Sequence, residues 1–298
     1  MNPAVLVTGA TGATGRATVA ELQSRGICVR ALVHKIDSRS EQLSRLGAEV
    51  VEGDLLDFPS VRSALEGMQR AYFLFPVIPG IIQAAGYFAQ AATEVRLESI
   101  VNMSQVTSRR EAESHATRDH WIAERLFDKS GIPVTHLRPT VFAEWLLYFA
   151  SRIAQDGCLS LPFGPVRQAV IAAEDQARVI ATILVNPGPH QNQIYPLYGA
   201  EELTFAEMAG EMSDVLNRPI RYQQIDFDSF ENGLLASGGD AFLAQHMRAV
   251  AADHRNGLFA GKNDQVEKIM GRKPLTVREF ILKNKEMFRA PSSQGAPA

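Results

Sequence analysis

The sequence is poor in cysteine: Cys28 and Cys158 are its only 2 cysteines among 298 residues, and they lie far apart. Cys28 belongs to an apolar run that we expect to form a buried strand, so free thiols are favoured over a disulfide. Long apolar runs are also missing, and none reaches the length of a membrane-spanning helix. The first residues lead straight into a strand pattern without the features of a signal peptide, so we expect a cytoplasmic location and no membrane partner.

Charge of one sign is not concentrated in blocks, and the formal net charge is −3. Without a cluster of lysine and arginine, we expect neither a nucleic-acid partner nor binding to an anionic membrane surface. His115, His136, His190, His246 and His254 show no metal-ligand spacing, so no metal site is expected. The G-x-S-x-G motif of serine hydrolases is also absent. Apolar residues (46%) and charged residues (21%) occur at the level of an ordinary globular protein of one large domain or two coupled domains.

Three glycines follow the first apolar segment at intervals of three residues, and this turn organises the rest of the chain. Residues 4–7 are typical of a strand, and residues 16–25 are typical of a helix that ends before Gly26. In such a turn Gly12 lets the backbone approach a pyrophosphate, and the free N–H groups of the helix face the phosphates. The alternative is a turn with a purely structural role. The predicted cofactor contacts in the turn are Gly9, Thr11, Gly12, Ala13, Thr14 and Gly15.

Strand and helix patterns then alternate along the chain, which predicts an α/β fold with a doubly wound, Rossmann-type parallel sheet. We expect the nucleotide-binding domain over residues 1–150 and a smaller α+β substrate domain over 151–290 that shares some strands with the sheet. Residues 291–298 are rich in Pro, Ser, Gly and Ala and are expected to be a disordered tail. The expected strands cover 28–33, 50–52, 70–75, 99–102, 134–139, 193–197 and 220–225. The expected helices cover 86–95, 118–130, 142–149, 175–184, 205–216 and 230–250, with a further one beginning near Pro59 and a last one beginning after Thr276. Their expected N-caps include Asp57, Thr204 and Thr276.

Ligands of such a sheet collect where its parallel strands end. The second strand ends at His34 and Lys35, where forms that prefer NAD carry an acidic residue. Basic groups there suit a 2′-phosphate, so NADP(H) is favoured and NAD(H) is the alternative; otherwise both are ordinary turn residues. The further candidate cofactor contacts at strand ends are Asp54, Leu55, Phe75, Pro76, Met103, Ser104 and Pro139.

Several short motifs are spread over residues 4–225: the run Val7–Gly15, Gly53-Asp54, His120 with Glu124, Gly131-Ile132-Pro133, Leu137-Arg138-Pro139 and the segment from Tyr195 to Thr204. In these motifs the chain resembles the NmrA-like branch of the atypical and extended short-chain dehydrogenases/reductases. The resemblance implies NADP(H) binding, because the branch includes NADPH-dependent quinone and triphenylmethane dye reductases.

One departure from the superfamily limits the chemistry. Its usual acid/base pair is Tyr-x-x-x-Lys on one helix face, but none of the 6 tyrosines here has lysine four residues on. Counted back from Gly131, the tyrosine position carries Ala116 and the lysine position carries His120. The resemblance therefore argues against a dehydrogenase, epimerase or dehydratase of that type. The quinone- and dye-reductase branch also lacks the dyad and has histidine in the lysine place.

His120 is the candidate catalytic residue. With an unperturbed pKa of about 6.5 it could donate a proton or hydrogen bond to an acceptor, or it could only bind the ribose or its own helix. Glu124, one helical turn later, is a candidate cofactor contact that could orient His120, or it could form an ordinary surface pair. Ser104 could contact the nicotinamide ribose or merely end its strand.

A flat, electron-poor acceptor such as a quinone would need an apolar wall beside the nicotinamide. Phe75, Pro76, Phe142, Trp145 and Phe149 could form it, although aromatic residues at helical spacing more often belong to a core.

Two classes of function remain open at this stage. The first is a reductase in which NADPH delivers hydride to a quinone or similar acceptor. The second is a non-catalytic NADP(H) sensor that binds a regulatory protein, because other NmrA-like proteins act that way. A homodimer is a further expected form of assembly.

Overall fold

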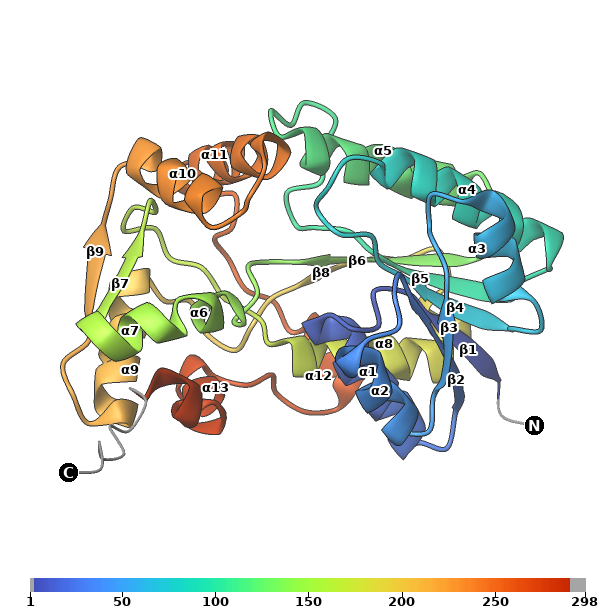
Figure 1. The fold of residues 1–298 in the computed structure, drawn as a ribbon, viewed down its shortest axis with the longest axis horizontal. Coiled ribbons are helices and arrows are strands. Elements are labelled where there is room, and N and C mark those ends of the chain that lie inside the picture. The colour runs from blue at the N-terminus through green and yellow to red at the C-terminus, as the bar shows by residue number, and fades with distance from the viewer. Residues whose placement is uncertain (1–2, 290–298) are drawn as a thin grey trace, which may run out of the picture.

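A parallel sheet between helical layers dominates the computed structural model, which describes residues 3–289 (Figure 1). Within that range the sheet has 7 strands in the order β3-β2-β1-β4-β5-β6-β8, and every neighbouring pair is parallel. Its inner strands are apolar and buried, as expected for a sheet covered on both faces. The strands are β1 Ala4–Val7, β2 Cys28–Val33, β3 Glu49–Glu52, β4 Arg70–Phe73, β5 Ser99–Met103, β6 Val134–Pro139 and β8 Ile194–Leu197.

Two layers of helices bury the two faces of the sheet. One apolar cluster joins the first face to α1, α2, α8 and α12, and a second cluster joins the other face to α3, α4 and α5. The first layer is α1 Ala13–Ser24, α2 Ser38–Arg45, α8 Ala173–Val185 and α12 Gln265–Met270, and the second is α3 Phe58–Leu65, α4 Ile81–Glu94 and α5 His115–Asp128. The predicted Rossmann-type α/β architecture is confirmed.

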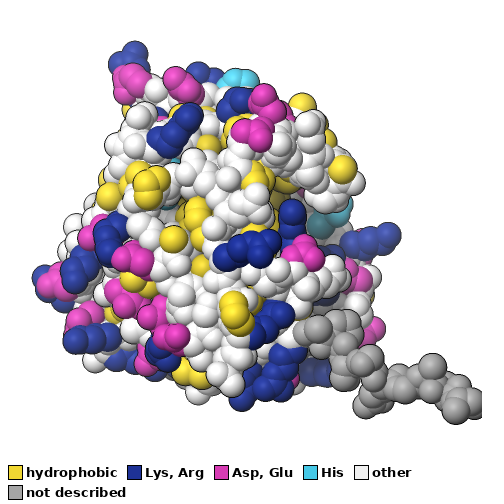
Figure 2. All heavy atoms as spheres, turned by 90° about the vertical axis from the view of Figure 1, so that its left-hand side faces the viewer, with side chains coloured by type: hydrophobic (Ala, Val, Ile, Leu, Met, Phe, Trp, Pro, Cys, Tyr) yellow, Lys and Arg dark blue, Asp and Glu magenta, His cyan; other side chains and the backbone are white. Residues whose placement is uncertain are grey.

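A second structural unit lies beyond the carboxyl ends of β6 and β8, at the left of Figure 1. Its own apolar cluster is separate from the two that cover the sheet, and it contains a small sheet in which β7 pairs with β9 in parallel. Figure 2 shows this end of the molecule, where basic and acidic side chains are interspersed. The elements outside the main layers are α6 Trp145–Tyr148, α7 Ala150–Asp156, β7 Cys158–Leu161, the short helix η1 Gly188–His190, α9 Phe205–Leu216, β9 Arg221–Gln224, α10 Phe227–Ala236, α11 Ala241–Arg255, α13 Val277–Lys283 and the short helix η2 Lys285–Phe288.

Local signals placed several helix starts correctly. Asp57 accepts a hydrogen bond from Ser60 N at 3.0 Å at the start of α3. Thr204 and Thr276 each form a capping box with a glutamate three residues on. These side chains satisfy backbone N–H groups that the first turn of a helix leaves free.

Other expectations were wrong. Cys28 is exposed rather than buried, because it is the first residue of β2 and lies where the strand enters the sheet. The helix expected over 86–95 begins at Ile81, directly after Gly80, whose φ of 113° ends the preceding loop. The helix expected over 230–250 is two helices, α10 and α11, and the strand β7 was not anticipated. The expected disordered tail, 291–298, lies outside the described residues.

Candidate cofactor and acceptor site

The glycine turn between β1 and α1 has little room for side chains at two of its three glycines. Gly9 has a φ of 58°, and a Cβ there would lie 2.6 Å from Leu74 Cδ2. A Cβ on Gly15 would lie 2.2 Å from the carbonyl oxygen of Gly9, which is closer than any stable contact. Both positions therefore need glycine in order to fold, which is the structural role expected of the turn.

Gly12 differs from its two neighbours in the motif. A Cβ built on it would meet only Gly9 O, at 3.3 Å, so its remaining surroundings are open. Gly12 is the N-cap of α1, and no side chain among the described residues caps this helix. Gly12 and Ala13 are exposed; Gly12 N donates to Gly9 O at 3.0 Å, whereas the N–H of Ala13, the first residue of α1, has no hydrogen-bond partner among the described residues. This arrangement can hold the phosphates of a dinucleotide, as proposed from the sequence.

Basic groups stand at the end of β2. His34 and Lys35 are exposed, and no hydrogen bond or ion pair joins either side chain to another described residue. Arg39, which follows them, is held by Asp37 at 2.6 Å. The contact of His34 and Lys35 with a 2′-phosphate stays a prediction.

The carboxyl ends of the other strands lie at the same edge of the sheet. Thr8 Oγ1 donates to Leu74 O at 2.9 Å and accepts from Leu74 N at 2.8 Å, which fixes the end of β1 beside the end of β4. Asp54 accepts from Leu56 N at 2.8 Å, so its carboxylate already shapes the turn after β3. Along this edge Leu55 is half-buried, Pro76 is exposed, and Phe75, Met103, Ser104 and Pro139 are buried.

One face of α5 carries a row of polar side chains, and its members contact the residues that follow β5 and the strand β6. The residues recur at intervals of three or four, which places them on one side of the helix. Thr117 donates to Gln105 Oε1 at 3.1 Å. The row, continued by one half-exposed residue, consists of Ser114, Thr117, His120, Glu124 and Asp128.

The second half of this row pairs with alternate residues of β6. Glu124 accepts two hydrogen bonds from Arg138, at 2.8 and 2.5 Å, and Asp128 contacts His136 Nε2 at 3.0 Å. Glu124 is fully buried, which removes the alternative of an ordinary surface pair. Its carboxylate is turned to Arg138, and its role as a cofactor contact stays a prediction.

His120 is the exception in the row, because its imidazole makes no hydrogen bond to another described residue. The side chain is only 7% exposed. Burial lowers the pKa of His120 to about 4; nearby His246 lowers it further and Glu124 opposes the shift. The unperturbed pKa assumed from the sequence is therefore wrong for this structure, and the neutral imidazole is the form present at pH 7.

The second unit covers the N-terminal end of α5, where α11 lies beside it (Figure 1). His246 Nδ1 lies 2.8 Å from Ser114 Oγ, and Gln245 bonds the backbone on either side, to His115 N at 3.1 Å and Glu113 O at 2.9 Å. Sequence reasoning dismissed His246 for lack of metal spacing and missed this contact. No local signal could have revealed it, since 132 residues separate the partners.

The proposed aromatic wall is divided between two cores. Phe75 packs in the cluster of α3 and α4, whereas Trp145 and Phe149 pack against the cluster of the second unit. The Trp145 ring lies 6.4 Å from that of Phe163. Phe142 is half-buried and its backbone bridges Ile171. The packing of these residues indicates that they belong to the apolar cores. Their contact with an acceptor stays a prediction.

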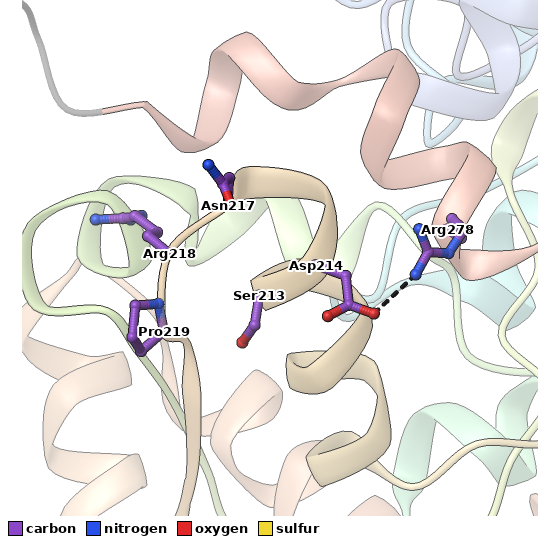
Figure 3. A pocket seen from close by; sticks show the side chains of 6 residues that line it. All are labelled: Ser213, Asp214, Asn217, Arg218, Pro219 and Arg278. Atoms are coloured by element: carbon purple, nitrogen blue, oxygen red, sulfur yellow. Dashed lines mark hydrogen bonds and ion pairs between the residues drawn. The ribbon is translucent and has the colours of Figure 1, made fainter.

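The side chains that line a hollow at the far end of the second unit form ion pairs and hydrogen bonds within the protein (Figure 3). Arg278 binds Glu211 and Asp214 at 2.7 and 2.8 Å. Arg218 donates to Ala154 O at 2.9 Å, which satisfies a carbonyl at the end of α7. Within residues 3–289, no group of three or more His, Cys, Asp or Glu side chains is placed to hold a metal ion. None of the described helices is long and apolar enough to cross a membrane.

Comparison with known proteins gives consistent matches over nearly the whole chain. The profile of the NmrA-like family matches residues 1–281. NAD(P)H azoreductase of Xenophilus azovorans is 28% identical over 288 residues, covering 96% of this chain and 99% of that protein. The (4-alkanoyl-5-oxo-2,5-dihydrofuran-3-yl)methyl phosphate reductase of Streptomyces griseus is 30% identical over 293 residues, covering 95% and 99%. The structure of the NADPH-dependent quinone oxidoreductase QOR2 of Escherichia coli, complexed with NADPH, has a TM-score of 0.82 at 20% identity, covering 94% and 99%.

Proposed function

Because this chain belongs to the NmrA-like family, we propose that it is an NADPH-dependent reductase of a flat, electron-poor acceptor of the quinone type. Relatives that match nearly its full length include an NAD(P)H azoreductase and a (4-alkanoyl-5-oxo-2,5-dihydrofuran-3-yl)methyl phosphate reductase, so reduction of a small organic molecule is the activity their names share. That the acceptor is a quinone is the more specific part of the proposal.

The edge of the sheet fits a dinucleotide. The open N-terminus of α1 at Gly12 and Ala13 would hold the pyrophosphate, and His34 and Lys35 would meet the 2′-phosphate. When bound, NADPH supplies a hydride from nicotinamide C4, and with one proton from solvent a quinone becomes a hydroquinone while NADP+ is left.

The observation that supports the reductase is the free imidazole of His120. Every other member of the polar row on α5 has a partner within the chain, whereas His120 has a neutral, buried ring and no hydrogen bond to the described residues. A neutral imidazole can donate a hydrogen bond to an acceptor oxygen and stabilise the charge that hydride addition places there. His120 therefore acts as a hydrogen-bond donor, and the proton comes from water.

The decisive experiment compares His120→Ala with His115→Ala, a histidine of the same helix that is exposed. Initial rates of NADPH oxidation with menadione as acceptor should fall about 10²-fold in His120→Ala, with NADPH affinity retained. His115→Ala should behave as the parent. Weakened NADPH binding with an unchanged saturated rate would instead assign His120 to the ribose.

The alternative function, a non-catalytic NADP(H) sensor, predicts a different result for the parent protein. It would bind NADPH tightly in calorimetric titration but oxidise none with a panel of quinones and azo dyes. That result would contradict the reductase.

A further inference from the structure

The second unit contributes a buried histidine to the neighbourhood of His120. His246, on α11, is 9% exposed and lies against the N-cap of α5, two turns before His120. The two rings are near enough that a charge on His246 would lower the pKa of His120. Neither imidazole takes part in the backbone hydrogen bonds of its own helix. The two rings are therefore brought near each other by the packing of the second unit against α5.

The hydrogen bonds of Ser114 show which ring nitrogen of His246 is left without a hydrogen-bond partner among the described residues. Ser114 Oγ accepts from Thr117 N at 3.0 Å, as an N-cap does. Its single hydroxyl proton can then be donated to His246 Nδ1, 2.8 Å away. Burial lowers the pKa of His246 to about 4, so the ring is neutral at pH 7 and carries its proton on Nε2. No described residue forms a hydrogen bond with that Nε2–H.

We propose that His246 contacts the acceptor through Nε2–H, so that imidazoles from α5 and α11 together bind one substrate. The proposal rests on the reductase function and makes the second unit the part that selects the acceptor. Two neutral donors suit a planar acceptor with two hydrogen-bond-accepting atoms, such as the two carbonyl oxygens of a quinone. An acceptor with one such atom would gain from only one of the two histidines.

A purely structural role is the competing explanation, because the contact with Ser114 also fixes α11 on α5. Gln245 separates the two roles, since it joins the same elements through His115 N and Glu113 O and is half-buried. Gln245→Ala removes contacts between α11 and α5 without removing an imidazole ring. His246→Asn keeps an amide near the position of Nδ1, where it can still meet Ser114, and removes Nε2.

The experiment titrates menadione into the NADP+-loaded protein by calorimetry and follows NADPH oxidation with the same quinone. His246→Asn should weaken menadione binding and lower kcat/KM about tenfold, the scale of one lost hydrogen bond. NADPH affinity and the midpoint of thermal unfolding should stay close to those of the parent. His246→Gln, whose amide reaches near the Nε2 position, should recover part of the affinity, and Gln245→Ala should match the parent in menadione binding.

Several outcomes overturn the proposal. Parent-like menadione affinity in His246→Asn would show that Nε2 does not face the acceptor. An equal loss in Gln245→Ala would show that docking of α11 is what matters. If the parent binds menadione without oxidising NADPH, the reductase fails, but the binding comparison still decides the role of His246. If the parent binds no menadione, both proposals are contradicted.

Discussion

The three glycines of the turn after β1 serve different purposes, although they look equivalent in the sequence. Gly9 and Gly15 are required by the fold, because a Cβ on either would overlap neighbouring atoms. Gly12 has open space beside it, so its missing side chain is useful only if something else fills that space. Gly9 and Gly15 therefore have a structural role, whereas Gly12 is the candidate for a binding role.

Gly12→Val should abolish NADPH binding while leaving the fold intact, because the new side chain occupies the space in front of the helix N-terminus. Gly15→Ala is the matched control: its Cβ meets Gly9 O, so we expect a loss of about 3 kcal/mol in unfolding free energy. Calorimetric titration and urea unfolding measure the two effects. Unchanged NADPH affinity in Gly12→Val would refute the phosphate site.

His34 and Lys35 predict the choice of cofactor. Because both are exposed and unpaired within the described chain, NADPH should bind more tightly than NADH, and salt should reduce the difference by screening. His34→Asp should shift the preference toward NADH by about tenfold or more. Titrations with both cofactors at low and high salt check this, and equal affinities in the parent would contradict it.

At the scale of elements, α5 and β6 are joined by two polar pairs in matching order. Glu124 and Asp128 are one helical turn apart, and Arg138 and His136 are alternate residues of the strand on the same side of the sheet. The order fixes how α5 lies along β6, and with it the position of His120 beside the strand ends.

Glu124→Leu should destabilise the protein by about 3 kcal/mol, because Arg138 loses the carboxylate that compensates its charge. The cost is at the low end for a buried pair, since the Arg138 side chain is 20% exposed and water can screen it. Glu94→Leu, which breaks the surface pair with Arg62, should cost about 1 kcal/mol or less. Equal losses in urea unfolding would show that the buried pair has no special role.

Sequence reasoning succeeded where the determining interactions are local. The glycine turn and the caps Asp57, Thr204 and Thr276 depend on residues within a few positions of one another. The strand β7 was missed because its 4 residues are ordered by pairing with β9, as Cys158 pairs with Arg221. The burial of Glu124 was also missed, because its partner is on another element. The features that the sequence did not predict depend on contacts between residues that are far apart in the chain, and not on how clear a local motif is.

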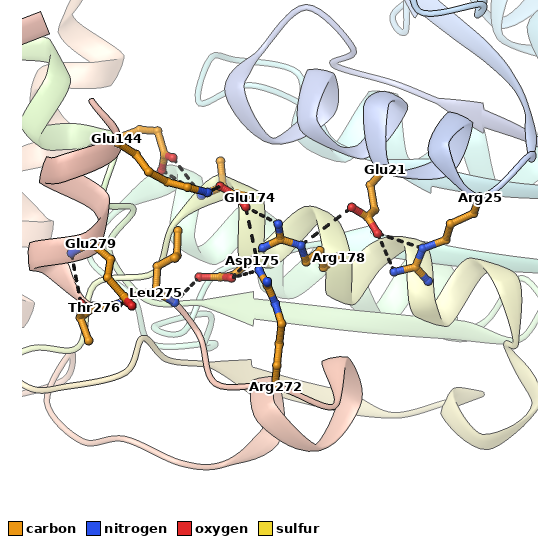
Figure 4. A network of polar contacts seen from close by, with 12 residues as sticks. Glu21, Arg25, Glu144, Glu174, Asp175, Arg178, Arg272, Leu275, Thr276 and Glu279 are labelled. Carbon is orange, nitrogen blue, oxygen red and sulfur yellow. Dashed lines mark hydrogen bonds and ion pairs between the residues drawn. The ribbon is translucent and has the colours of Figure 1, made fainter. Parts of the chain in front are cut away.

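At the scale of the whole molecule, charged groups join the second unit to α8 and α1. Asp175 of α8 is fully buried and accepts from Leu275 N at 2.7 Å, just before α13 (Figure 4). Arg178, on the same helix, lies 3.4 Å from Asp175 and 3.9 Å from Glu21 of α1. On the other side, Arg109 pairs with Asp253 of α11 at 2.7 and 2.8 Å. The site edge is thus held from both sides by contacts between units.

Three of the four histidines that are buried within residues 3–289 make the stability of the whole protein acid-sensitive. Burial lowers the pKa of each to about 4, so below pH 6.5 the unfolded chain takes up protons that the folded chain refuses. Stability is therefore fully present above about pH 6.5 and falls as the pH drops toward 4. Burial raises the pKa of Asp175 to about 6, which acts in the opposite sense over nearly the same window. The histidines concerned are His120, His246 and His254.

His254→Phe isolates one of these contributions. The ring of His254 lies 5.0 Å from Phe163 and 6.0 Å from Phe205, and neither of its nitrogens has a partner among the described residues, so phenylalanine suits the environment. The stability gained by the variant should grow by about 1.4 kcal/mol for each pH unit between 6.5 and 4, which is the linkage of one proton. Urea unfolding of parent and variant at pH 7, 6 and 5 measures this difference. A gap that does not change with pH would mean that His254 is protonated alike in the folded and unfolded states, and acid sensitivity would then have to come from the other buried histidines, His120, His136 and His246.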